Sequence, residues 1–128
     1  MNRTALTVSA PLVGWAALVI AVSSVPGDRL PPAPSLWQWD KLAHTFEYLV
    51  LTLLLYRYAV VRRGYTHARA AWFCAAACIS YGVADELHQL LIPLRNCAWQ
   101  DMAADASGVA AALLLVTAGG VRRRVLWS

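Results

Sequence analysis

Charged residues are scarce in this sequence, and acidic residues are the scarcer kind. Only 14% of the 128 residues are charged, whereas an ordinary soluble domain contains roughly 25%. Seven acidic residues face eleven lysines and arginines, and 59% of the chain is hydrophobic. A soluble fold of this size cannot bury so much apolar surface. The composition therefore predicts a single domain whose solvent is lipid.

Cysteine is also rare, and several familiar catalytic signatures are missing. The three cysteines do not provide a disulfide framework. The chain contains no glycine-rich phosphate loop, no nucleophile elbow and no zinc-finger spacing. The formal charge of +4 would suit nucleic acid, but the arginines form short clusters between apolar runs. Such spacing is typical of membrane topology, and we expect no nucleic-acid partner.

Long apolar stretches are present, and each predicts a membrane-spanning helix. No residue between Arg3 and Asp28 is charged, which leaves a run long enough to cross the roughly 30 Å hydrocarbon core. A cleaved signal peptide is the alternative for this first stretch. We predict helices over residues 5–25, 40–61, 67–91 and 101–120, with Asp40 and Asp101 as N-cap candidates. The expected fold is all-α, a polytopic four-helix transmembrane bundle with short loops that forms one domain over residues 1–128.

The distribution of basic residues orients this bundle, because cytoplasmic loops carry an excess of lysine and arginine. With the N-terminus inside, eight basic residues lie on the inner side and three on the outer side. We therefore expect a multi-pass protein of the cytoplasmic membrane with both termini in the cytoplasm. All seven acidic residues then lie on or near the outer side.

The last three predicted helices carry polar and ionisable residues at the end assigned to the outer side. On each helix they fall on or beside one stripe: Asp40, His44 and Glu47 on the second, Asp85, Glu86, His88 and Gln89 on the third, and Asp101 and Asp105 on the fourth. Several of these residues would lie inside the hydrocarbon core. An ionised carboxylate there costs several kcal/mol unless it is paired, hydrated or bound to a metal. We predict a polar, water-accessible cavity that these helices enclose and that opens to the outer leaflet.

Ionisable residues inside a membrane mark functional sites by default, and a histidine beside carboxylates can transfer protons. The catalytic candidates are His44, Glu47, Asp85, Glu86 and His88. Lys41 and Arg95 would hold an anionic group, the arginine by a two-pronged contact. The full set of binding candidates is Asp40, Lys41, Tyr48, Gln89, Arg95, Asp101 and Asp105.

Two other interpretations use the same residues. A divalent cation could bind within the set His44, Glu47, Asp85, His88 and Asp105. Alternatively, the cluster is a structural ion-pair network in a non-catalytic binding, transport or assembly protein. Small residues at 75–77 and 110–112 would permit a homo-oligomer as well as close packing within the chain.

Four motifs follow one another in order: Asp40-Lys41-x-x-His44-x-x-x-Tyr48, Gly82-x-x-Asp85-Glu86-x-x-Gln89, Pro93-x-Arg95 and Asp101-x-x-x-Asp105-x-x-Gly108. Together with Ser23-Ser24-x-Pro26 they resemble the VanZ-like family of small bacterial membrane proteins, over roughly residues 20 to 112. The chain has Asp105 where many members have Asn, and Ala111 or Ala112 where they have a second Gly.

This resemblance implies a protein of the bacterial cell envelope, and the distribution of basic residues places its polar site on the extracytoplasmic side of the cytoplasmic membrane. The family's namesake is associated with resistance to the glycopeptide antibiotic teicoplanin, which implies a link with antibiotic resistance. The resemblance implies no particular reaction. We therefore predict a VanZ-like protein that binds or processes an anionic lipid or envelope-precursor head group, with membrane lipid as its partner.

Overall fold

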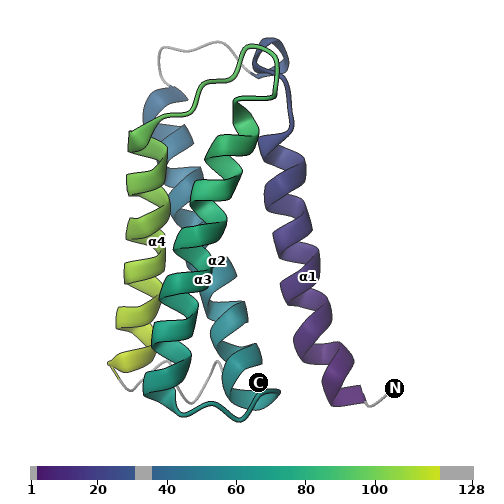
Figure 1. The fold of residues 1–128 in the computed structure, drawn as a ribbon, viewed down its shortest axis with the longest axis vertical. Helices are drawn as coiled ribbons and strands as arrows, with labels where there is room; N and C mark the ends of the chain where they lie inside the picture. The colour runs from purple at the N-terminus through teal and green to yellow at the C-terminus, as the bar shows by residue number, and fades with distance from the viewer. Residues whose placement is uncertain (1–2, 31–35, 119–128) are drawn as a thin grey trace.

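The computed structural model describes residues 3–30 and 36–118, which form an all-helical fold (Figure 1). Within these residues the chain contains four α-helices, a single 3-10 turn and no strand. They are α1 (Arg3–Ser23), η1 (Gly27–Arg29), α2 (Leu36–Val61), α3 (His67–Gln89) and α4 (Trp99–Thr117). The prediction of an all-α fold is confirmed.

The helices lie side by side, and consecutive helices run in opposite directions (Figure 1). The end of α1, the start of α2, the end of α3 and the start of α4 therefore lie together at one end of the bundle. We call this end, made of residues 20–30, 39–48 and 82–105, the polar end. It contains the acidic residues of α2, α3 and α4.

Two helix starts differ from the prediction. α2 begins at Leu36 and α4 at Trp99, so neither Asp40 nor Asp101 is an N-cap. Asp40 lies more than one turn inside α2, and Asp101 lies in the first turn of α4 behind the cap residue Ala98. The physical reason is that both carboxylates pair with the Lys41 ammonium group instead of with backbone N–H groups at a helix start.

The other helix bounds differ from the prediction by only a few residues, as is usual where helix ends fray. The first helix spans 3–23 rather than 5–25, and the third ends at 89 rather than 91. The fourth ends at 117, and the last predicted positions, 119 and 120, lie outside the described residues.

A glycine sets the closest helix crossing, which joins α2 to α4. A Cβ atom on Gly108 would overlap the Thr45 carbonyl oxygen and would lie 3.0 Å from the Leu49 nitrogen. Only a residue without a side chain permits this approach of two backbones. The crossing lies just below the polar end, so it brings the start of α2 against the start of α4.

α1 packs against α2 and α3 and is held by hydrogen bonds to the backbone. The Trp15 indole donates to the Glu47 carbonyl at 2.9 Å, and the Tyr81 hydroxyl donates to the Ala16 carbonyl at 2.7 Å. By length and hydropathy, Leu6–Ser23 of α1 is the one stretch of the described residues that qualifies as a membrane span. Composition thus identifies one span, whereas the sequence predicts four.

The surface of the bundle is apolar along each of the four helices. Exposed large apolar residues include Val13 on α1, Phe46 on α2, Trp72 on α3 and Leu114 on α4. Many buried side chains at the polar end, by contrast, are charged or polar. At the polar end this arrangement is the reverse of that in a soluble helical bundle, where apolar side chains face the core and polar ones face solvent.

Candidate functional site

The polar end buries a set of side chains that rarely lie inside a protein without partners. Glu86 is 0% exposed, Asp105 3% and His44 6%, and Asp85, Gln89, Ser23 and Asp101 are also buried. Groups of this kind must be hydrogen-bonded, paired with an opposite charge or bound to a metal. Their contacts divide the site into three parts.

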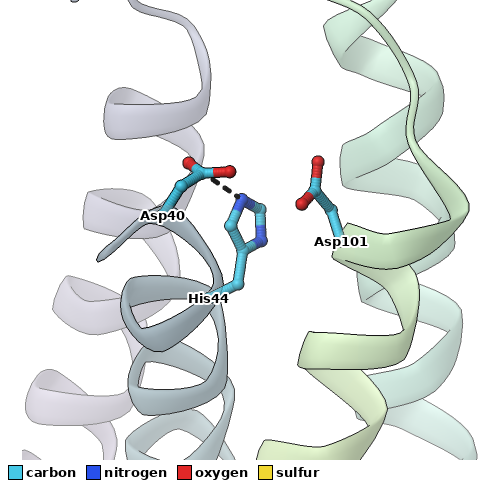
Figure 2. A group of neighbouring side chains, drawn as sticks. All are labelled: Asp40, His44 and Asp101. Atoms are coloured by element: carbon cyan, nitrogen blue, oxygen red, sulfur yellow. Dashed lines mark ion pairs between the residues drawn. The ribbon is translucent and has the colours of Figure 1, made fainter. Parts of the chain in front are cut away.

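The first part, which we call the mouth, consists of Asp40, Lys41 and His44 of α2 and Asp101 of α4. The Lys41 ammonium contacts the Asp101 carboxylate and lies 3.2 Å from Asp40 Oδ2. Figure 2 shows His44 between the two carboxylates, with His44 Nε2 at 4.0 Å from Asp40 Oδ1. Lys41 therefore matches charge within the chain, whereas the sequence suggested that it would hold an external anion.

The second part lies deeper and joins all three charged helices. His44 Nδ1 and Asp105 Oδ1 are hydrogen-bonded at 2.9 Å. Glu86 of α3 is adjacent, since ligand atoms of His44, Glu86 and Asp105 all lie within 4.8 Å of one another. We call these three residues the buried triad.

Glu86 also connects the buried triad to the loop that joins α3 to α4. The Ala98 backbone N–H donates to Glu86 Oε2 at 3.1 Å, and the Gln89 amide donates to Glu86 Oε1 at 3.4 Å. The Arg95 guanidinium in turn donates to Gln89 Oε1 at 2.9 Å. The structure thus gathers these candidates in one hydrogen-bonded chain that runs from the interior to the loop.

The third part lies between α3 and α1. It contains two other candidates, Asp85 and His88, which contact α1 rather than the buried triad. The Ser23 hydroxyl donates to Asp85 Oδ2 at 2.6 Å, and Ser24 Oγ lies 3.0 Å from His88 Nε2. Both serines occur in the family motif, yet the sequence did not identify them as site residues. The available signal was a pair of adjacent serines at the end of a long apolar stretch.

The structure regroups the predicted metal ligands. It brings His44 and Asp105 together with Glu86, and it forms a second possible group from Asp40, His44 and Asp101. The other three residues of the predicted set, Glu47, Asp85 and His88, belong to neither group of described residues. The half-buried Glu47 is held through its backbone carbonyl, which accepts the Trp15 indole N–H.

Apart from Asp101 Oδ1, which contacts Lys41, three buried oxygen atoms at the polar end have no hydrogen-bond partner among the described residues. They are Tyr48 Oη, Asp85 Oδ1 and Asp105 Oδ2. A Cβ atom on Gly82 would lie 3.0 Å from Asp105 Oδ2 and 3.3 Å from the Tyr48 ring, so α3 approaches both residues closely here. The binding candidate Tyr48 therefore forms part of the floor of the site.

A small cavity between α3 and α4 reaches this floor. Its volume is about 40 Å³, and its walls include Gly82, Met102 and Asp105. That volume accommodates a water molecule or an ion, whereas pockets for organic ligands measure roughly 300 Å³ or more. This cavity is therefore too small for a lipid head group.

Fold and site together define a class: an all-helical bundle with an apolar exterior and a cluster of carboxylates and histidine buried at one end. This chain belongs to the VanZ/LLP1 family, whose family model matches residues 7–121. The resemblance seen in the four motifs is thus confirmed. No curated protein and no solved structure matches the chain.

Proposed function

We propose that this VanZ/LLP1 protein spans the bacterial cytoplasmic membrane with all four helices and binds a phosphate-bearing lipid head group at its polar end. Both termini are cytoplasmic in this proposal, and the polar end faces the outer leaflet. The main support for this proposal is that charged groups are buried at the polar end while the exposed surface along the helices is apolar. Ionisable residues inside a membrane protein usually face the interior and mark a ligand or ion pathway.

The direction of the side chains supports four spans even though composition identifies one. On α3, Asp85 and Glu86 are buried while their neighbours Val83 and Leu87 are exposed. Mean hydropathy along the sequence includes the buried charged residues. The lipid would contact only the exposed apolar residues beside them, so the lipid-facing surface is more apolar than the mean hydropathy indicates. With 26, 23 and 19 residues, α2, α3 and α4 are about as long as the roughly 30 Å hydrocarbon core is thick, at about 1.5 Å per residue.

Exposed tryptophans support the same placement. Trp39 and Trp99 are 66% and 73% exposed at the polar end, and Trp72 is 79% exposed near the start of α3 at the opposite end. Tryptophan is enriched at both membrane–water interfaces, where its ring is apolar and its N–H group can be hydrated. The two levels of exposed tryptophan match the two edges of a bilayer.

The proposed contact for the phosphate is Arg95 in the loop between α3 and α4. A guanidinium group has five N–H donors, and the described residues use one of them for Gln89. No described carboxylate forms an ion pair with Arg95. Arginine binds phosphate by two parallel hydrogen bonds, whereas Lys41 is already matched by Asp40 and Asp101.

Lipid binding in nanodiscs tests this proposal. We would compare neutral phosphatidylcholine alone with the same lipid doped with polyprenyl phosphate or with phosphatidylglycerol, which distinguishes a lipid-linked precursor from a bulk phospholipid. We expect the phosphate-bearing lipid to be retained, and retention to fall about tenfold, or about 1.4 kcal/mol, in Arg95→Gln. Arg29→Gln, an exposed arginine at the same end, is the matched control. Equal retention by all three proteins, or no preference over neutral lipid, would refute head-group binding.

Cysteine labelling tests the topology separately. In a cysteine-free background, Arg29→Cys places a thiol at the polar end and Arg63→Cys places one in the turn between α2 and α3. A membrane-impermeant maleimide added to intact spheroplasts should label the first variant and not the second. Labelling of the Arg63→Cys variant alone, or of both variants equally, would contradict the orientation.

The family resemblance adds a role in resistance to teicoplanin to this proposal. A strain that expresses the chain should be less susceptible to teicoplanin than the same strain with Arg95→Gln expressed at an equal level. Identical susceptibility of the two strains would refute a role of this chain in resistance and would leave the head-group proposal intact.

A further inference from the structure

The buried triad has the composition and spacing of a cation site. His44 comes from α2, Glu86 from α3 and Asp105 from α4, and the ligand atoms lie within 4.8 Å of one another in the buried interior. We propose that these three residues bind one divalent metal cation. Nothing in this assignment depends on which lipid the protein binds.

The balance of charge distinguishes the buried triad from the mouth. At the mouth, the Lys41 ammonium contacts both carboxylates and so supplies the cation that Asp40 and Asp101 require. The buried triad contains two carboxylates, and its one basic group, His44, forms the ion pair that is seen with Asp105. Two buried carboxylates with a single histidine leave negative charge that costs several kcal/mol, which a bound metal would offset.

Unpaired oxygen atoms give a second and independent indication of a ligand. Asp105 binds His44 through Oδ1, while its Oδ2 is buried without a partner beside Gly82 and Tyr48. The Tyr48 hydroxyl is buried and unpaired as well. Buried polar atoms in folded proteins almost always have partners, so these two unpaired atoms at the triad indicate that an ion or a bound water lies there. The cavity of about 40 Å³ that reaches Asp105 has room for a water molecule.

The ligand types indicate which metals would bind. One imidazole nitrogen and two carboxylates suit Zn²⁺ or Mn²⁺, whereas Ca²⁺ requires about six to eight oxygen ligands. Metal ligands have to be deprotonated, so the cation would replace the proton that His44 shares with Asp105 and would release it to solvent. Three protein ligands leave coordination positions open to water or to another oxygen donor.

An open coordination position on the metal would let it bind the phosphate of a lipid head group. This second inference rests on the proposed function. Carboxylates outnumber lysine and arginine at the polar end, which disfavours a phosphate group. A divalent cation would reverse the local charge and could accept one phosphate oxygen as a ligand. Metal binding can be measured without lipid, so the two proposals can fail independently.

The test uses the purified full chain in neutral detergent, stripped with a chelator and titrated with Mn²⁺ alone while free Mn²⁺ is followed by electron paramagnetic resonance. We expect one Mn²⁺ per chain, and affinity lower by at least about tenfold in Glu86→Gln and Asp105→Asn. Glu47→Gln is the matched control, because it removes a carboxylate from outside the triad, and it should bind like the wild type. No saturable binding by the wild type, or equal binding by triad and control variants, would overturn the proposal.

A measurement on the wild type alone keeps the proposal testable if a triad variant does not fold. Pulsed electron paramagnetic resonance of the Mn²⁺ complex should detect coupling to one histidine nitrogen, which changes when histidine is labelled with ¹⁵N. Bound Mn²⁺ without such coupling would exclude His44 as a ligand. Polyprenyl phosphate retained equally with and without a chelator would leave head-group binding intact and refute the bridging use of the metal.

Discussion

The same three helices bury opposite kinds of side chain at their two ends. At the polar end, α2, α3 and α4 converge on carboxylates and a histidine. In the opposite core they converge on Tyr56, Ala59, Ala70, Cys74 and Val116, which are small or apolar. Burying ionisable groups rarely adds stability, whereas close apolar packing does. The opposite core therefore stabilises the bundle by apolar packing, whereas the polar end adds little stability, which supports the proposal that it is a ligand site.

The largest expected effect comes from moving a charge into the opposite core. Cys74 is fully buried on α3, so Cys74→Asp would place a carboxylate where no partner exists among the described side chains of that core. We expect a loss of several kcal/mol in the free energy of unfolding, measured in mixed micelles by far-UV circular dichroism. Cys97→Asp, in the loop at the polar end, should change it little. Similar values for both variants would remove the distinction between the two ends.

Removing the cation of the mouth should have the next largest effect. Lys41→Met leaves Asp40 and Asp101 without their shared ammonium group. Breaking a fully buried pair costs about 3–5 kcal/mol, and partial exposure of this pair reduces our expectation to about 2 kcal/mol. The double variant Lys41→Met, Asp101→Leu should recover most of the loss in the same unfolding measurement. A double variant as unstable as the single one would show that the pair does not act as a unit.

The crossing of α2 and α4 connects the two ends and gives a third comparison. Gly108→Ala forces the two backbones apart at Thr45, which should cost about 1–3 kcal/mol and weaken Mn²⁺ binding by displacing Asp105 from His44. Gly14→Ala on α1 meets open space and should stabilise that helix by up to about 1 kcal/mol. The Mn²⁺ affinity and the free energy of unfolding should therefore both decrease in Gly108→Ala and not in Gly14→Ala. Unchanged metal affinity in a destabilised Gly108→Ala would contradict this coupling.

The smallest expected effect concerns the contacts of α1. Ser23→Ala removes the hydroxyl donor of Asp85 and should cost about 1 kcal/mol, because a buried carboxylate oxygen loses its partner. Ser24→Ala, which is less buried, should cost about half of that. Thermal unfolding of the two variants in one detergent would compare them directly. A larger loss for Ser24→Ala would show that His88, rather than Asp85, governs the docking of α1.

The sequence predicts the helices and the level of the charged groups because both depend on local patterns. Residues 67–89, for example, form one helix whose charged end is visible in the sequence. The helix stripe likewise places His44 on the face toward the other charged helices. These predictions need only helical periodicity and the high energy of a charge facing lipid.

The partners of each group depend on how neighbouring helices rotate and cross, which a local pattern does not contain. Asp85 and Glu86 are consecutive and therefore point about 100° apart on α3. The packing turns Glu86 toward His44 and leaves Asp85 with Ser23, a residue 62 positions earlier. Asp40 was expected to cap a helix because no sequence feature shows that α2 begins four residues earlier.

The most direct test of the account is native mass spectrometry of the protein released from its own membrane without added lipid or metal. We predict a retained mass equal to one phosphate-bearing lipid, reduced in Arg95→Gln and unchanged in Arg29→Gln. A divalent metal should also be retained, and this mass should be lost in Asp105→Asn. A wild-type protein that carries only neutral lipid, or that retains the same masses as both Arg95→Gln and Asp105→Asn, would contradict the central claim that the polar end is a ligand site.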